Sequence, residues 1–255
     1  MSDGRKRVEC DRHGQTPAAF VCQHLLGGVA CGYHGSDEDE ADPWPDAWCD
    51  LCEATFQRDG EWTDANEPKI NLLCTGCYEE ARERNERLLP PLHPGQLAVT
   101  EHELQALAQE AFSRCDLRQE QVKQLWPAFS EAERWFYDDE SRTIRFFDDP
   151  AKVFLVADVT IVGSLSTRSN TWLWSWGNEQ YGPRDIGHMG RLRVFGEVRG
   201  IERFHQPLWS AEEVDAWEVT QIAAELLGAE AIYRMPLDHL FVFLLLDNFR
   251  EQAAD

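Results

Sequence analysis

The stretch CDRHGQTPAAFVCQHLLGGVACGYH, residues 10–34, holds three cysteines and three histidines. Downstream, CDLC at residues 49–52 and CTGC at residues 74–77 each place two cysteines three positions apart. This spacing lets two sulfurs from one tight turn reach a single metal ion. Seven of the 8 cysteines lie between residues 10 and 77. The pattern predicts that the first third of the chain is a metal-binding region.

The two CxxC pairs predict a four-cysteine zinc site, because two such turns supply the four ligands of a closed tetrahedral ion. The gap between the pairs is close to the range that is usual for such sites. The expected ligands of this site are Cys49, Cys52, Cys74 and Cys77.

The upstream stretch predicts a second zinc site. Cys10 and His13 form a CxxH half-site, but tetrahedral zinc takes four ligands and this stretch offers six. Spacing alone leaves two ways to complete the set. The candidates are Cys22 with His24, and Cys31 with His34.

We expect both zinc ions to be structural. Sites closed by four protein ligands supply folding energy, whereas a catalytic zinc keeps an open position. Residues 1–89 are rich in glycine, proline and acidic residues and contain few aliphatic runs. Such a segment could hardly bury a sufficient core without metal.

The sequence shows no signal for export or membrane insertion. Its start, MSDGRKRVECDRHG, has basic residues with no apolar run after them, and the longest apolar run, LFVFLLL at residues 240–246, is too short to span a bilayer. We therefore expect a cytoplasmic protein with no membrane partner. In that compartment thiols stay reduced, so paired cysteines indicate metal rather than disulfides.

The chain is strongly acidic, with 24 Lys and Arg against 46 Asp and Glu and a net charge of −22. Such a surface repels nucleic acids and attracts basic proteins. The densest acidic run precedes tryptophans in a proline-containing loop, a combination suited to steering and anchoring a partner. The residues predicted to bind a partner are Asp37, Glu38, Asp39, Glu40, Asp42 and Trp44.

A domain boundary is predicted after the cysteine-rich region. A charged helix is expected over residues 78–89, and prolines at positions 90, 91 and 94 interrupt it. The predicted domains are a Cys/His-rich zinc-binding domain at residues 1–90 and a second domain at residues 95–255.

The second domain is predicted to be α+β, an antiparallel sheet with packed helices, because its strands and helices do not alternate as βαβ units. Capping boxes at Thr100 and Ser210 and a glycine stop at Gly228 mark two helices, the first with a buried Cys115, and a third is expected over residues 186–198. Strands are expected at residues 134–149 (a hairpin), 152–166, 171–178, 231–236 and 240–249. Trp172, Trp174 and Trp176 alternate in the third of these and are expected to share one packed face.

Four stretches of the second domain resemble an uncharacterised bacterial domain family over roughly residues 134–249. They are IVGSLSTRSNTWLWSWGN, FGEVRGIERF, AWEVTQIAAELLGAEAIYRMP and FVFLLLDNF. The N-terminal third resembles a separate bacterial zinc-binding pattern, and this resemblance favours one of the two upstream ligand sets. The favoured set is Cys10, His13, Cys22 and His24.

Proteins of this kind resemble immunity proteins that accompany antibacterial toxins of type VI and contact-dependent secretion systems. The resemblance implies a non-enzymatic inhibitor whose acidic surface covers the basic substrate-binding cleft of a cognate toxin, a nuclease in the expected case. The expected partner is therefore a basic toxin protein and not nucleic acid.

Two other functions remain open at this stage. A zinc-dependent nucleic-acid-binding or regulatory module would need a basic face, for which the first third offers only short patches. A metalloenzyme would need a zinc with an open position. The chain has no Gly-rich phosphate loop, no GxSxG motif and no HExxH motif, so we expect no enzyme.

Overall fold

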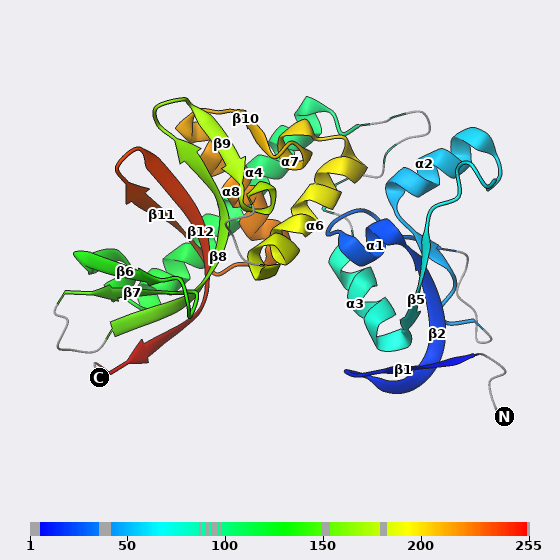
Figure 1. Cartoon of the computed structure of the whole chain (residues 1–255), viewed down its shortest axis with the longest axis horizontal. Helices are drawn as coiled ribbons and strands as arrows, with labels where there is room; N and C mark the ends of the chain where they lie inside the picture. The colour runs from blue at the N-terminus through cyan, green and yellow to red at the C-terminus, as the bar shows by residue number, and fades with distance from the viewer. Residues whose placement is uncertain are drawn as a thin grey trace. The chain divides into compact units, whose positions relative to one another are not determined.

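Two compact units make up the protein (Figure 1). The computed structural model describes residues 6–35, 42–86, 88, 89, 92, 96, 98–148, 154–178 and 183–253. The first unit comprises residues 1–103 and 190–205, and the second comprises residues 104–189 and 206–255. Helices occur with largely antiparallel sheets, which confirms the α+β fold class.

The two units divide the chain differently from the domains expected at residues 1–90 and 95–255. The first unit extends to residue 103, past the expected start of the second domain. Residues 190–205, which the sequence assigned to the second domain, belong to the first unit. A break in composition marks where a chain leaves a unit, but it does not show that a later segment returns to it. The prolines at positions 90, 91 and 94 lie outside the described residues.

The first unit consists of short strands and helices. Its elements are β1 (Arg7–Cys10), β2 (Gly14–Cys22), α1 (Gln23–Gly27), β3 (His34–Gly35), β4 (Ala47–Trp48), α2 (Asp50–Asp59), β5 (Ile70–Cys74), α3 (Thr75–Asn85), the part of α6 (Pro183–Arg199) from Gly190, and α7 (Glu202–His205). The helix expected at residues 78–89 is α3, which begins and ends a few residues earlier.

Strand β2 organises this unit. Strand β1 pairs with its N-terminal half and β5 with its C-terminal half, both antiparallel, and α3 lies along β2 and β5 (Figure 1). Alternate side chains of β2, such as Ala19 and Val21, enter a core, while Phe20 between them is exposed. Four of the ten buried residues of that core are cysteines, so thiols occupy much of the space that aliphatic side chains usually fill.

The second unit is built on a long, seven-stranded sheet with helices packed against it. Its elements are α4 (Glu101–Leu125), α5 (Ala128–Glu131), β6 (Arg134–Asp138), β7 (Thr143–Phe147), β8 (Phe154–Ser166), β9 (Thr171–Trp174), the 3₁₀-helix η1 (Ser175–Gly177), β10 (Leu208–Ser210), α8 (Glu213–Leu227), β11 (Ala231–Leu237) and β12 (Leu240–Gln252). The predicted hairpin and the predicted closing strands are confirmed as β6–β7 and β11–β12.

Strand β8 is the centre of this sheet. Strand β12 pairs with β8 along almost its whole length, and on the other edge β7 pairs with its first half and β9 with its second half (Figure 1). β8 has a neighbour on both edges, and most of its side chains are buried, as the sequence predicted. The core contains Ile144, Val159 and Leu244 together with Val122 of α4.

Helices α4 and α8 lie next to each other in the second unit (Figure 1). Arg118 and Arg114 of α4 both donate to Glu225 of α8, with N–O distances of 2.7 and 3.0 Å. Cys115 is buried on α4, as expected. These two ion pairs therefore link α4 to α8.

The helix caps agree with the sequence at two of three positions. The Thr100–Glu103 capping box is confirmed, and Gly228 ends α8 with a φ of 72°. The capping box predicted at Ser210 is wrong: Ser210 ends β10, and Glu212 with Asp215 forms the box instead. Acidic side chains accept hydrogen bonds from helix N-terminal amides as well as serine does.

The tryptophan-rich strand is shorter than predicted. Trp172 and Trp174 share a face of β9, both are fully buried, and their rings meet edge to face at 5.4 Å. Trp176 lies on η1, beyond the strand, so the prediction of three tryptophans on one strand face is wrong for the third. A Cβ at Gly163 would lie 2.6 Å from the Trp172 ring, so this glycine makes room for the indole.

No helix among the described residues is long and apolar enough to cross a membrane.

Candidate metal centres

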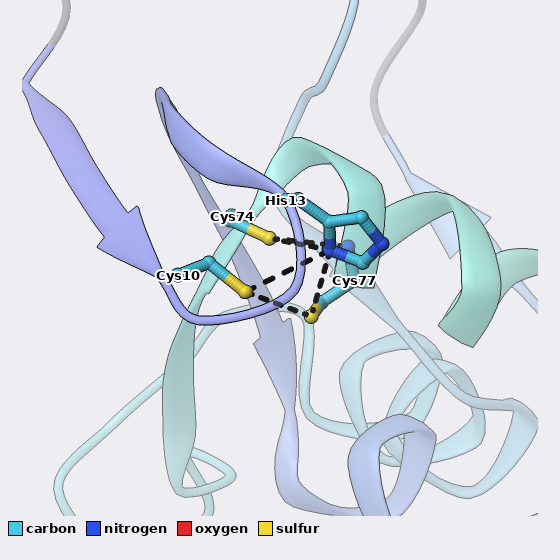
Figure 2. Close-up of side chains that lie close together, drawn as sticks. All are labelled: Cys10, His13, Cys74 and Cys77. Atoms are coloured by element: carbon cyan, nitrogen blue, oxygen red, sulfur yellow. Dashed lines mark hydrogen bonds between the residues drawn. The ribbon is translucent and has the colours of Figure 1, made fainter.

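Four side chains from the ends of β1 and β5 and from the turns that follow these strands converge at one point (Figure 2). Cys10 ends β1 and His13 lies in the turn before β2, while Cys74 ends β5 and Cys77 lies in the first turn of α3. We call this group the outer cluster. Its ligand atoms all lie within 4.8 Å of one another.

The distances in the outer cluster fit a tetrahedral ion. The Nδ1 atom of His13 lies 3.3 Å from the Cys74 sulfur, 3.5 Å from the Cys77 sulfur and 3.7 Å from the Cys10 sulfur. The sulfurs of Cys10 and Cys77 are 3.9 Å apart. Zinc–sulfur bonds of about 2.3 Å place tetrahedral ligands roughly 3.8 Å apart, so an ion fits between these atoms.

A carboxylate supports the imidazole of the outer cluster. Glu80 Oε1 lies 3.4 Å from His13 Nε2, the nitrogen that faces away from the cysteines, and Arg12 donates two hydrogen bonds to the same carboxylate. A histidine that binds a metal through one nitrogen usually donates a hydrogen bond from the other to a carboxylate or carbonyl. Gly76 leaves space for the ring, because a Cβ there would lie 2.6 Å from His13 Cγ.

A second group, which we call the inner cluster, has the same composition. It contains Cys22, His24, Cys49 and Cys52, with their ligand atoms within 4.8 Å of one another. His24 Nδ1 lies 3.4 Å from the sulfurs of both Cys49 and Cys52 and 4.0 Å from that of Cys22. The two sulfurs from α2 are 3.6 Å apart. This group also has room for one tetrahedral ion.

Helix N-termini position three of the cysteines. Cys22, Cys49 and Cys74 are the N-cap residues of α1, α2 and α3, and the Cys74 sulfur accepts a hydrogen bond from the Cys77 amide at 3.3 Å. The positive end of a helix and its unpaired amides stabilise a thiolate. The start of each helix thus fixes the place of one sulfur in its cluster.

Within each cluster, one thiol has a lowered pKa and a neighbouring thiol a raised one. Backbone hydrogen bonds from Arg12 and His13 lower the pKa of Cys10 to about 6. Desolvation, with the neighbouring thiols, raises the pKa of Cys77 to about 12. In the inner cluster, hydrogen bonds from Cys49 and Cys52 lower the pKa of Cys22, and burial raises that of Cys49. Three thiolates can share such a site only if a cation compensates their charge.

The structure combines the predicted ligands in a different way from that expected. The eight residues predicted to bind zinc are the eight residues of the two clusters, but the four-cysteine site of Cys49, Cys52, Cys74 and Cys77 is not formed. The predicted set of Cys10, His13, Cys22 and His24 is also wrong as a group. In chain order, the half-sites are Cys10–His13, Cys22–His24, Cys49–Cys52 and Cys74–Cys77. The first combines with the fourth and the second with the third, so the half-sites are nested.

Strand β2 explains this nesting. The Cys10–His13 half-site precedes β2 and Cys22 is its last residue, so the other eight residues of the strand lie between the two half-sites. An extended strand rises about 3.3 Å per residue, which keeps these half-sites too far apart for one ion. Cys74 pairs with Ala18 on β2, and this register brings the last half-site to the first.

The other candidate ligands, Cys31 and His34, belong to neither cluster. The Cys31 thiol is buried and lies 3.5 Å from the carbonyl of Val29, and burial raises its pKa to about 12. His34 Nε2 lies 2.5 Å from Asp50 Oδ1. The alternative ligand set that used this pair is therefore not formed.

Asp50 is part of a buried ion pair that the sequence did not reveal. Its side chain, almost fully buried, accepts a hydrogen bond from Nη1 of the fully buried Arg199, and Arg199 Nε donates to the carbonyl of Ala30 at 3.1 Å. Gly32 has a φ of +75°, and a Cβ there would lie 2.1 Å from Asp50 Oδ1. The pair links α6 to α2, beside Cys49 of the inner cluster.

The predicted partner-binding loop is only partly described. Asp37, Glu38, Asp39 and Glu40 lie outside the described residues. Asp42 is exposed, and Trp44 is partly buried, with its indole nitrogen donating to Glu79 at 2.9 Å. Trp44 also packs against the cysteine-containing core, so it has a structural role whatever else it binds.

A family profile, described as a family of unknown function (DUF6882), matches residues 105–249. This is more than half of the chain. The chain belongs to this family. The match includes residues 190–205 of the first unit and excludes both clusters. The expected likeness to an uncharacterised domain family is thus confirmed, and the DUF6882 description assigns no activity. No curated protein and no solved structure gave a significant match.

Sequence reasoning missed Glu80 and the Asp50–Arg199 pair. Glu80 lies three residues after Cys77 on α3, so a helical periodicity argument could have placed it beside the cluster. Arg199 offered no such signal, because its partner lies 149 positions earlier in the chain.

Proposed function

We propose that this protein is a zinc-stabilised binding protein without enzymatic activity. The observation that carries the proposal is that each cluster offers four ligand atoms in tetrahedral reach of one another. A zinc ion held by three thiolates and an imidazole has no open position for water or substrate, so it would supply folding energy rather than catalysis.

The donor set supports zinc as the metal. Thiolates are soft ligands that select zinc, copper(I) and iron–sulfur clusters, and a tetrahedral set of three sulfurs and one nitrogen is typical of structural zinc. Cys10, His13, Cys74 and Cys77 would hold one ion, and Cys22, His24, Cys49 and Cys52 the other. Such ligands need a reducing compartment, which supports a cytoplasmic location.

The proposed partner is a basic protein, because the net charge of −22 would draw a cationic surface toward this one. Several arginines already lie in ion pairs with carboxylates of the same chain, including Arg12 with Glu80 and Arg250 with Asp158. The surplus charge is therefore carried by carboxylates. We propose an immunity protein as the specific form, with a nuclease toxin whose basic cleft it covers.

Metal content is the first test. Native mass spectrometry of the purified full chain should show two zinc ions, and Cys-to-Ser substitution in either cluster should remove one. A metal-free chain that is fully folded from residue 6 to residue 86 would contradict the proposal of structural zinc.

The partner is tested with the protein encoded beside this gene. We expect a basic protein whose nuclease activity falls to background at one equivalent of this chain. The association rate should fall steeply between about 0.05 and 0.5 M salt, because screening shortens the reach of the charges. A neighbouring nuclease that keeps its activity, or an association rate independent of salt, would contradict the proposal.

A further inference from the structure

A groove lies between α4 and α8 of the second unit. No residue of either cluster lines it. Its volume is about 1020 Å³, and residues of these two helices line it. The floor is apolar, with Ala108 and Phe112 from α4 and Val214 and Trp217 from α8. The spacings of four and three residues place each pair on one helical face.

Two of these apolar side chains are unusually exposed. Phe112 is 54% exposed and Val214 is 67% exposed, although both lie in regular helices. Trp217 is held from behind by the core residue Phe243, whose ring it meets edge to face at 5.2 Å. The groove is therefore a firm apolar surface with a fixed aromatic floor, the kind of surface that accepts an amphipathic helix.

The charges along the groove favour a basic partner. The two segments that form it, residues 105–113 and 213–221, contain four carboxylates and no lysine or arginine. Arg234 pairs with Glu213 and Arg114 with Glu110, so the carboxylates of the two segments still outnumber the arginines that pair with them. A second copy of this chain would bring the same carboxylates face to face, and like charges at a contact are unfavourable.

We propose that this groove docks an amphipathic helix from a basic protein. The apolar side of that helix would cover Phe112 and Val214, and its lysines or arginines would face the acidic first half of α8. The inference takes the class of partner from the proposed function, and it adds a docking site in the DUF6882 region.

A model peptide tests the groove. The probe is a fluorescein-labelled amphipathic helix made of leucine and lysine only, and the comparison peptide replaces each lysine by glutamate. Fluorescence anisotropy with the zinc-loaded full chain should show binding of the leucine–lysine peptide at low salt and no binding of the leucine–glutamate peptide. Loss of discrimination between these peptides would overturn the proposal.

Matched substitutions locate the binding. Phe112→Ser and Val214→Ser should each weaken the leucine–lysine peptide by about tenfold or more, because the apolar contact area is lost. Leu117→Ser is the control: Leu117 is 66% exposed on α4 but does not line the groove, so its affinity should change less than about twofold. All three sites are exposed, and thermal unfolding verifies that each variant is folded.

The outcomes separate this inference from the proposed function. If the basic peptide binds but neither groove substitution weakens it more than Leu117→Ser does, the groove proposal fails while a basic partner remains supported. If no basic peptide binds at about 100 µM, the groove proposal fails as well. A dimer of the free chain that Phe112→Ser dissociates would assign the groove to a second copy and overturn the proposal.

Discussion

The buried cores of the two units contain different kinds of side chain. The cysteine-containing core of the first unit includes four thiols beside small residues such as Ala19 and Ala47. The core cluster of the second unit contains branched and aromatic side chains such as Ile144, Phe146 and Leu244, and no cysteine. The first unit buries candidate metal ligands in its core, whereas the second unit buries hydrocarbon side chains.

The two cores indicate different sources of folding free energy. Burying a leucine or phenylalanine side chain contributes about 1.5–3 kcal/mol, and the second unit repeats this many times over a long sheet. The first unit has short strands and fewer large apolar residues, so metal–ligand bonds would take over the role of that burial.

Removing the metal should have the largest effect. A strong chelator is expected to unfold the first unit and to leave the second folded, because structural zinc contributes apparent binding energies of about 10–16 kcal/mol. Hydrogen exchange measures this: protection should disappear from β2, β5 and α3 and persist in β8 and β12. Equal loss of protection in both units would show that the two regions are not stabilised separately.

Paired cysteine substitutions should reveal the nested grouping. The double variant Cys10→Ser/Cys74→Ser is expected to bind one cobalt(II) ion, because both residues belong to the outer cluster. The variant Cys49→Ser/Cys74→Ser should bind none, since it damages both clusters. Cobalt absorption spectra count the ions. The reverse result would restore the four-cysteine site that the sequence alone suggests.

Breaking the buried ion pair should destabilise the first unit. Arg199→Met leaves the Asp50 carboxylate buried without its cation, which typically costs about 3–5 kcal/mol. The double variant Arg199→Met/Asp50→Asn should recover part of this loss. Urea unfolding followed by hydrogen exchange measures both. An Arg199→Met variant as stable as the wild type would mean that the pair does not hold α6 in the first unit.

A cavity in the second core should act on that unit alone. Leu244→Ala removes a fully buried side chain of β12 and should cost about 2–5 kcal/mol of unfolding free energy, with zinc content unchanged. Phe136→Ala is the control, because Phe136 is exposed on the same sheet and should change stability by less than about 0.5 kcal/mol. Loss of zinc from the Leu244→Ala chain would contradict independent stabilisation.

The smallest effect is expected at a helix end. Gly228→Ala should cost about 1 kcal/mol, because Gly228 has a φ of 72° and L side chains are strained there. Gly190→Ala is the contrast: Gly190 lies within α6 with open space around it, so alanine should stabilise by about 0.5–1 kcal/mol. Thermal melts compare them, and equal signs for the two substitutions would contradict this account.

Most of the elements of the second unit could be predicted from sequence, because their signals are local. The β6–β7 hairpin, β8 and the β11–β12 pair carry apolar or alternating runs bounded by turn residues. The third tryptophan was misplaced since Trp176 continues the alternation although the strand has ended. Periodicity does not show where a strand stops when the next turn keeps its pattern.

The ligands were predictable, but their grouping was not. Cysteine and histidine spacing marks each half-site, since two ligands on one turn must be close in sequence. Which half-sites meet depends on the register of β2 with β5, where Ala18 faces Cys74. The same limitation hid Arg199, because no local pattern links it to Asp50.

The nested arrangement of the ligands predicts the order in which the two clusters can form during translation. Cys52 leaves the ribosome before Cys77, so the inner cluster has all its ligands first, and closing its shorter loop costs less entropy. Arg199, which pairs with Asp50 beside Cys49, emerges much later. We therefore expect the nascent chain to bind its first metal ion early and to complete the Asp50–Arg199 pair only after Arg199 has emerged.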